Sequence, residues 1–225
     1  MIKFTKNPPA VKAHCAEAVK INSAREMYSD IALFWVQNNG DSIIGMLDGN
    51  MVIYNNAADT DELREFVSVI APKTVFSDSD TLSALFGDAF HTVCVMQSDA
   101  NYISDLQSDR LCSKEIYNLL DVDGLCLPPY EFFAVDFCHR LNHGGLDYFA
   151  IKDSCCAVCI SGGETVLING IASHSKGMGT AALNGVLSKY TGKTFLAVCE
   201  KDLCDFYLKN NFKLSYLAGY WGTSL

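Results

Sequence analysis

The chain has 225 residues, of which 49% are hydrophobic, so it can bury a sizeable core, and this composition excludes wholesale disorder. Its 17 basic and 26 acidic side chains give a net charge of −9, which repels nucleic acid and argues against it as a partner. No apolar run is long enough to span a bilayer and the first residues lack a signal-peptide pattern, so we expect a cytoplasmic protein with no membrane partner.

The first half alternates predicted helices and strands, and polar turns such as Asn-Asn-Gly-Asp separate the strands. A helix is followed by three strands, a helix, a strand, a short helix and a final strand. These segments cover residues 10–24, 31–37, 42–47, 51–56, 60–71, 73–77, 80–87 and 90–97. Residues 98–110 are polar, and we expect them to link the two halves.

The second half repeats the alternation after a predicted helix that runs from Pro-Pro to Gly-Gly. Three β-rich runs follow as an antiparallel meander, and then come a helix, a strand, a second helix and a last strand. These segments cover residues 128–145, 146–153, 155–160, 165–173, 179–190, 193–198, 202–210 and 212–221. Leu183, Val186, Leu187 and Tyr190 are spaced three and four apart, which predicts that they form the apolar stripe of helix 179–190.

The two halves share this element order and a local echo. "KTVFSDSDTLSALFGDAF", which begins at Lys73, corresponds to "KTFLAVCEKDLCDFYLKNNF", which begins at Lys193. We therefore predict an α/β (α+β) protein with a mixed, mostly antiparallel sheet flanked by helices, built as a tandem of units 1–108 and 109–225.

Ten cysteines stand in a sequence without a secretory signal, so we interpret them as reduced, buried hydrophobes. Cys155, Cys156 and Cys159 are close in sequence, which would suit a metal site. On a predicted strand, however, Cys155 and Cys159 share one face while Cys156 lies on the other. We therefore predict that no metal is bound.

The loop "HSKGMG" places Gly177 and Gly179 directly at a predicted helix start. The amides from Ser175 to Thr180 would lie unpaired there, and the helix dipole adds positive potential. Glycine removes the Cβ that would block close approach, so the pattern predicts a pyrophosphate site. The competing interpretation is a tight strand-to-helix turn with no ligand.

Residues 147–217 together resemble the GNAT-type N-acetyltransferases. The resemblance depends on the order strand, glycine loop, helix, strand and the segment "FYLKNNF", which is similar to the family's aromatic-Tyr-x-Lys-x-Gly-Phe. The sequence departs from the family pattern at three positions. His174 replaces an Arg or Gln, Asn211 replaces a Gly, and Glu200 replaces an Asn that contacts the cofactor in many members.

The resemblance implies that acetyl-CoA is the co-substrate and that a primary amine of a small molecule or peptide attacks its thioester directly. It implies that the pantetheine arm lies between two splayed parallel strands, beside Ile171, Ala172 and Ser173. It also implies that Tyr207 protonates the departing thiolate. The pyrophosphate would be held by Ser175, Lys176, Gly177, Met178, Gly179 and Thr180.

Several roles stay open at this stage. Tyr207 is either the acid or a core aromatic, and Cys199 is either an acetyl-accepting nucleophile or a buried hydrophobe. The general base is not fixed by the pattern. Its candidates are Glu131, Asp136, His139 and Glu164.

The first half has no glycine loop, since "AADT" from Ala57 to Thr60 precedes its helix, and Leu85–Phe86 replace Phe206–Tyr207. We expect a degenerate copy of the fold that forms one wall of the acceptor cleft. We also expect this half, or the segment "IKFT", to cover the sheet edge left where the chain stops early. The main alternative function is an acyl-CoA-binding regulatory module without turnover, and another is a structural protein. The oligomeric state is expected to be a monomer or a homodimer.

Overall fold

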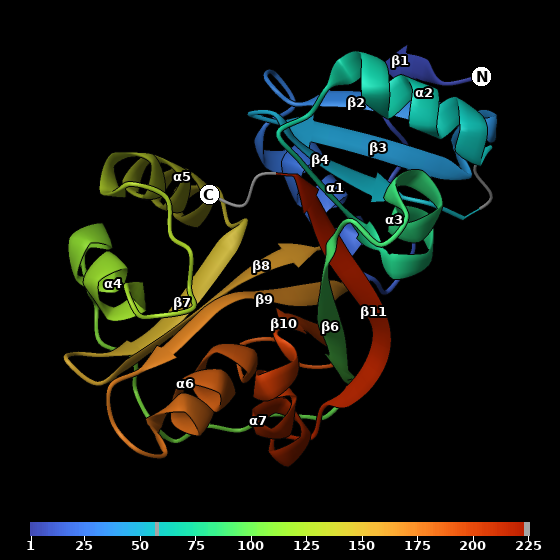
Figure 1. Cartoon of the computed structure of the whole chain (residues 1–225). Coiled ribbons are helices and arrows are strands. Elements are labelled where there is room, and N and C mark those ends of the chain that lie inside the picture. Colours follow the sequence, from blue (N-terminus) through green and yellow to red (C-terminus); the bar gives the residue numbers. More distant parts are fainter. Residues whose placement is uncertain (57–58, 223–225) are drawn as a thin grey trace.

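The computed structural model describes residues 1–56 and 59–222, and it confirms the alternation of helices and strands (Figure 1). The first half consists of β1 (Lys3–Thr5), α1 (Ala16–Met27), β2 (Leu33–Gln37), η1 (Asn38–Gly40), β3 (Ser42–Leu47), β4 (Asn50–Tyr54), α2 (Thr60–Ile70), β5 (Thr74–Asp78), α3 (Ser79–Phe86) and β6 (His91–Ser98). The second half consists of α4 (Ser113–Leu120), α5 (Tyr130–Asn142), β7 (Leu146–Ile151), β8 (Cys155–Gly162), β9 (Thr165–Ser173), α6 (Met178–Leu187), β10 (Thr194–Cys199), η2 (Lys201–Leu203), α7 (Cys204–Lys209) and β11 (Lys213–Gly222).

One sheet contains all eleven described strands, in the order β1-β2-β3-β4-β5-β11-β6-β10-β9-β8-β7. Among these strands, β4 pairs with β5 and β9 pairs with β10 in parallel, and the other pairs are antiparallel. The predicted mixed, mostly antiparallel sheet is therefore confirmed.

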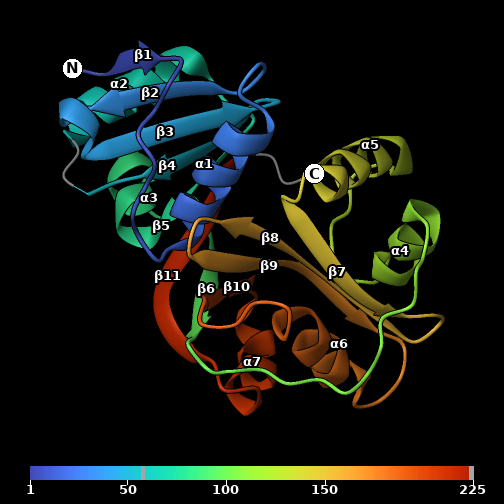
Figure 2. The same ribbon diagram turned by 180° about the vertical axis from the view of Figure 1, so that it is seen from behind.

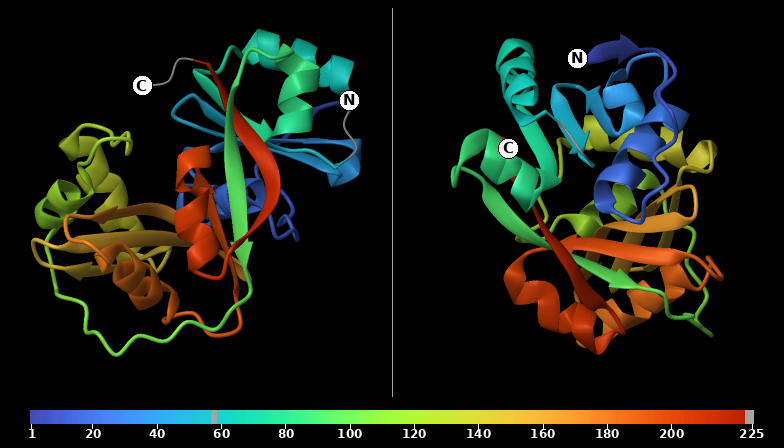
Figure 3. Two further views of the ribbon diagram at one scale, coloured as in Figure 1. Left: turned by 60° about the horizontal axis from the view of Figure 1, so that its bottom comes forward. Right: turned by 90° about the vertical axis from the view of Figure 1, so that its right-hand side faces the viewer.

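The two halves exchange their last strands. β6 of the first half lies between β10 and β11, while β11 of the second half lies between β5 and β6 (Figures 1 and 3). The first half therefore covers the open edge of the second, as one of the two alternatives predicted. The other alternative is wrong, because β1 pairs with β2 at the far edge of the sheet. The exchange makes the sheet continuous across the two halves. The boundary between two units after residue 108 therefore stays a prediction.

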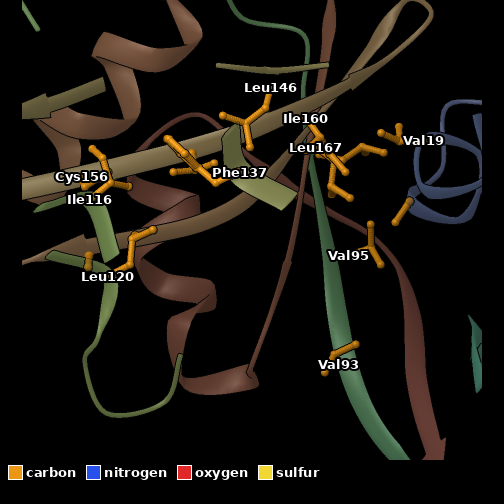
Figure 4. Close-up of a cluster of buried hydrophobic side chains, with 14 of the residues drawn as sticks. Val19, Val93, Val95, Ile116, Leu120, Phe137, Leu146, Cys156, Ile160 and Leu167 are labelled. Atoms are coloured by element: carbon orange, nitrogen blue, oxygen red, sulfur yellow. The ribbon is translucent and has the colours of Figure 1, made fainter. Parts of the chain in front are cut away.

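Helices cover both faces of the second half. α4 and α5 pack on one face, where Ile116 and Phe137 meet Leu146 and Leu167 in a buried cluster (Figure 4). α6 and α7 pack on the other face, where Leu183 lies in a second cluster. No helix within the described residues is long and apolar enough to cross a bilayer.

Helix α1 lies in the angle between the two halves (Figure 2). It contacts β3 and β4 of its own half as well as β8 and β9 of the other. Its face toward the second half buries Ala16 and Val19, and its face toward the first buries Ala18 and Ile21. Burial on two sides makes α1 the packed joint between the halves.

Local expectations differ from the structure in several helices. α6 ends at Leu187, so Tyr190 of the predicted stripe lies beyond the helix. α1 begins at Ala16 rather than at residue 10. α4 was not predicted, although its apolar residues Ile116, Leu119 and Leu120 are spaced as a helical stripe and are buried. The helix expected over residues 202–210 begins as the 3-10 turn η2, in which Leu203 is 48% exposed.

The face assignment of the cysteines in β8 is confirmed. Cys155 and Cys159 lie in the cluster under α6, and Cys156 lies in the cluster under α4 and α5. Burial raises the pKa of the Cys156 thiol to about 12, which disfavours the thiolate that a metal needs. Within residues 1–56 and 59–222, no three His, Cys, Asp or Glu side chains are grouped to hold a metal ion.

Candidate functional site

Strands β9 and β10 separate partway along their length. They pair in parallel from Thr165 and Thr194 as far as Ile168 and Ala197. At the next residue, Asn169, β9 carries a bulge, because Ile168 and Gly170 face consecutive residues of β8. A bulge bends its strand and breaks the ladder, so it explains why the two strands part here. From residue 169 to residue 173, the edge of β9 that faces β10 is not paired with any strand of the described residues.

The glycine loop follows the open end of this gap. β9 ends at Ser173, and α6 begins at Met178 with Gly177 as its N-cap. Gly177 has φ of +83° and ψ of −15°, a left-handed conformation that favours glycine. The Ser173 hydroxyl donates a hydrogen bond of 2.6 Å to the Ser175 carbonyl, which closes the turn.

Most amides of this turn are available to a ligand. The Met178 N–H donates to the Ser175 carbonyl at 3.1 Å, so the expectation of free amides is wrong at that residue. The amides of Ser175, Lys176, Gly177, Gly179 and Thr180 have no hydrogen-bond acceptor among the described residues. They lie at the positive end of a ten-residue helix, which favours an anion.

The two glycines serve different purposes. A Cβ added at Gly177 would meet nothing within 4 Å, so the space above this residue is open. A Cβ at Gly179 would lie 3.3 Å from Phe206 Cε2, so this glycine allows α7 to pack closely against the helix start. Gly177 therefore admits a ligand, while Gly179 fixes the wall beside it.

A shallow pocket of about 430 Å³ opens at the loop. Ser173, Phe206 and the loop residues from His174 to Gly177, with Gly179 and Thr180, line it. The Lys176 side chain has no ion-pair partner among the described residues, so it supplies an unpaired positive charge beside the amides. Six of the nine residues predicted to bind the cofactor line this pocket, and Ile171 and Ala172 lie on the open edge of β9 directly before it, whereas Met178 does not line the pocket.

The residues that depart from the family pattern have structural partners. His174 Nε2 donates to the Leu119 carbonyl at 3.0 Å, which ties the loop to the end of α4. Glu200 Oε1 lies 2.7 Å from His91 Nε2 of β6, away from the loop. Asn211 takes φ of +64°, a left-handed conformation that Asn tolerates better than most residues other than glycine.

Tyr207 belongs to the buried cluster under α6 and α7. Its side chain is 3% exposed, and its ring packs edge-on against Phe206 and Phe212. Its phenol has no hydrogen-bond partner among the described residues. Burial, with a smaller effect of the nearby Cys199 thiol, raises the pKa of the phenol above its ordinary value. Cys199 is the last residue of β10, beyond the point where β9 has departed, so the phenol is near the gap.

Cys199 does not have the properties of a nucleophile. It is 6% exposed, and burial followed by the neighbouring Cys204 raises its pKa well above that of a free thiol. A nucleophilic cysteine needs the opposite shift. The interpretation of Cys199 as a small buried hydrophobe is the one that this geometry favours.

The corresponding helix start in the first half is already occupied by a carboxylate. Asp59 is the N-cap of α2, and its side chain accepts a hydrogen bond of 3.2 Å from the Glu62 N–H. An anionic ligand would meet like charge there. The expected loss of the cradle agrees with this cap, although Ala57 and Ala58 lie outside the described residues. Leu85 is buried in the core, and Phe86 stacks on Trp221.

None of the candidate bases lines the pocket at the glycine loop. His139 Nε2 donates to the Met27 carbonyl at 2.9 Å, and Asp136 is engaged by Arg140 and Tyr28. Glu131 and Glu164 are exposed, at the start of α5 and in the β8–β9 turn. The general base therefore stays open.

Sequence reasoning missed a buried carboxylate on α1. Glu17 is 3% exposed, and its Oε2 accepts a hydrogen bond of 2.6 Å from the Tyr216 phenol of β11. Its Oε1 is buried with no partner among the described groups. Burial is the largest cause that raises the pKa of Glu17, and the Tyr216 bond opposes it. Only the exchange of β11 reveals this pair, because the residues are 199 positions apart.

Glu17→Gln is expected to stabilise the protein above acidic pH. Because the folded pKa is raised, the folded state holds this proton at a pH where the unfolded chain has lost it. Stability therefore falls as pH rises from the ordinary value of 4.5 through the raised folded value, and stays lower above it. Removing the charge should raise Tm by about 2–4 °C for each 1 kcal/mol recovered.

Thermal unfolding between pH 4 and pH 8 measures this effect. The gain in Tm should be larger at the alkaline end, and Glu65→Gln on the exposed face of α2 should show no such trend. A loss of stability at pH 8 in Glu17→Gln would contradict the assignment of a buried, costly charge.

The comparisons with known proteins concern the fold. No protein-family model and no curated protein matches this sequence. A Novosphingobium aromaticivorans protein described as a GNAT-family acetyltransferase matches with a TM-score of 0.54 and 10% identity, over 91% of this chain and 96% of its own. A tandem GNAT protein from the clavulanic acid biosynthesis pathway matches over 100% of both chains, with a TM-score of 0.52 and 10% identity.

A third similar structure is Saccharomyces cerevisiae N-myristoyltransferase with bound myristoyl-CoA. Its TM-score is 0.51 at 9% identity, over 98% of this chain and 72% of that chain. At these identities the likeness shows the fold alone. The chain therefore has the GNAT fold, and its match to a tandem GNAT protein along the whole length confirms the predicted fold class.

Proposed function

We propose that this chain with the GNAT fold is an acetyl-CoA-dependent N-acetyltransferase that acts on a primary amine of a small molecule or peptide. The observation that carries the proposal is the set of five unpaired amides at the start of α6, placed at the open end of the β9–β10 gap. A pyrophosphate suits such amides, and an extended arm suits an unpaired strand edge. Coenzyme A contains both groups.

Each part of the co-substrate has residues to hold it. The pyrophosphate would accept hydrogen bonds from the amides between Ser175 and Thr180, with Lys176 adding charge. The pantetheine amides would pair with the edge of β9 at Ile171, Ala172 and Ser173, as an added strand does. The thioester would then lie near the Asn169 bulge, where β9 leaves β10.

The transfer needs no covalent enzyme intermediate. The amine nitrogen attacks the thioester carbon, the C–S bond breaks, and the thiolate leaves. The amine gives its proton to water or to a base, and the thiolate takes one from the Tyr207 phenol, which burial keeps protonated. An unpaired amide of β9 would stabilise the negative charge that develops on the carbonyl oxygen.

Acetyl-CoA is expected to stabilise the purified protein. At 100 times its dissociation constant, a ligand that binds the folded state alone adds about 2.7 kcal/mol, which for a chain of this size raises Tm by roughly 5 to 11 °C. A thermal-shift titration measures this, with acetate and free pantetheine as controls that lack the pyrophosphate. The absence of any shift at millimolar acetyl-CoA would exclude the site.

Release of coenzyme A thiol in the presence of an amine panel then separates an enzyme from a binding module. Stabilisation by acetyl-CoA together with thiol release supports the transferase. Stabilisation without release against any amine would instead indicate a regulatory module that holds acyl-CoA.

A further inference from the structure

A second pocket lies between the two halves of the chain. Its volume is about 220 Å³, and it is lined from α1, the β3–β4 hairpin, α5 and strands β8 and β9. The first half contributes Lys20 and Asp48, and the second contributes Asp136, Arg140 and Asn169. The tandem arrangement thus creates a pocket that neither half could form alone.

This pocket adjoins the same stretch of β9 as the glycine loop. Asn169, the bulge residue where β9 leaves β10, is part of its lining, while Ser173 lines the pocket at the loop. The four residue steps between them cover about 13 Å of strand. A molecule bound along this edge of β9 would have one end in each pocket.

Two of the four charged side chains neutralise each other. Arg140 Nε lies 2.9 Å and 3.1 Å from the two Asp136 oxygens, and its Nη1 donates to the Ser23 hydroxyl at 2.6 Å. The Tyr28 phenol also donates to Asp136. Asp136 and Arg140 are thus already paired with each other and with neighbouring side chains. We expect them to form a wall of the pocket rather than to bind the charged groups of a ligand.

Lys20 and Asp48 have no such partners. Neither side chain has a hydrogen bond or an ion pair to another described residue, although the Lys20 ammonium lies 4.9 Å from the centre of the Phe76 ring. Lys20 is half-buried, and Asp48 is exposed at the turn between β3 and β4. The pocket therefore presents one unpaired positive and one unpaired negative charge beside the apolar side chains of Ile21, Leu47 and Ile160.

We infer that this pocket binds the acceptor, and that the acceptor is a small zwitterionic amine with an apolar side chain, of the α-amino acid class. The inference rests on the proposed function. Lys20 binds the carboxylate of the acceptor, Asp48 attracts its ammonium group, and the apolar side chain packs on Ile21 and Ile160. The amine loses its proton to water and attacks the thioester at Asn169.

The test compares amines that differ only at the carboxylate. Leucine, methionine and phenylalanine are assayed against their amides with acetyl-CoA, and thiol release gives kcat/KM. We expect kcat/KM for the acids to exceed that for their amides by about tenfold or more, because only the acids offer a carboxylate to the unpaired Lys20 ammonium. Lys20→Met should remove this preference by lowering kcat/KM for the acids alone.

Matched variants control for folding and for charge. Lys12→Met removes an exposed lysine outside the pocket and should leave the preference unchanged. Asp48→Asn should raise KM for both acids and amides, since both carry the ammonium. Asp153→Asn is its control, because Asp48 and Asp153 are both exposed and have similar φ of +53° and +56°.

Calorimetric titration of coenzyme A distinguishes a failure of the proposed function from a failure of the inference about the acceptor. Lys20→Met and Asp48→Asn should bind coenzyme A as the wild type does. If the wild type binds none, the proposed function fails. If it binds coenzyme A but turns over amides as fast as acids, or if Lys20→Met keeps the preference, the inference about the acceptor alone is overturned. If it binds coenzyme A without any turnover, leucine titrated into the loaded protein must still bind, and its failure to bind overturns the inference.

Discussion

Gly177→Glu is expected to weaken coenzyme A binding by at least about a hundredfold, which corresponds to about 2.7 kcal/mol or more. The Gly177 position has open space above it, so a side chain there would occupy the place that we propose for the pyrophosphate. The new carboxylate would also face like charge, and a juxtaposition of like charges costs several kcal/mol. Calorimetric titration of coenzyme A into the variant measures the loss.

The control for this variant must carry the same backbone strain. Gly163 in the β8–β9 turn has φ of +70°, and a Cβ added there also meets nothing within 4 Å. Gly163→Glu should lose similar stability and keep its affinity for coenzyme A. Gly177→Asn, which tolerates the left-handed conformation and adds no charge, should lose less affinity than Gly177→Glu. Tight binding retained in Gly177→Glu would remove the basis of the proposed function.

The sequence predicts those parts of the site that depend on local chain geometry. A helix start marked by Gly177, a strand that ends at Ser173 and an apolar stripe at Leu183 and Val186 all follow from spacing over a few residues. β9 ends at Ser173 as predicted, and α6 begins at Met178, one residue before the predicted start. These features depend on near neighbours in the chain, and periodicity or turn chemistry records them.

Features that depend on distant pairing could not be predicted. The apolar alternation of β6 and β11 predicts strands, but it does not specify which strand each will join, and here each joins the other half. The pairing of Glu17 with Tyr216 and the pocket between the halves both follow from that arrangement. The Asn169 bulge could not be predicted from the sequence either. A bulge exists only relative to the residues of the partner strand that it faces, here those of β8.

The exchange of strands also makes the sheet of each half depend on the other. β6 pairs with both β10 and β11, so the sheet of the second half is interrupted without it. The first half additionally places Lys20 and Asp48 against the second. The first half, in which Asp59 caps α2, therefore contributes both to the sheet and to the pocket between the halves.

Tyr207→Phe is expected to lower kcat by about a hundredfold to ten-thousandfold, the usual contribution of a general acid, while the affinity for coenzyme A changes little. The ring packs between Phe206 and Phe212, and phenylalanine preserves those contacts. The hydroxyl has no partner among the described residues, so its removal leaves no buried group unsatisfied. The effect should therefore fall on the departing thiolate rather than on folding.

The pH profile and a matched tyrosine distinguish this role from packing. Because burial raises the pKa of Tyr207, the acid stays protonated, and kcat of the wild type should not decline on the alkaline side below about pH 10. Tyr190→Phe is the control, since that phenol donates to Asp147 at 2.7 Å and should affect stability but not kcat. Unchanged turnover in Tyr207→Phe would assign the residue to the core, and transfer would then depend on water as the proton donor.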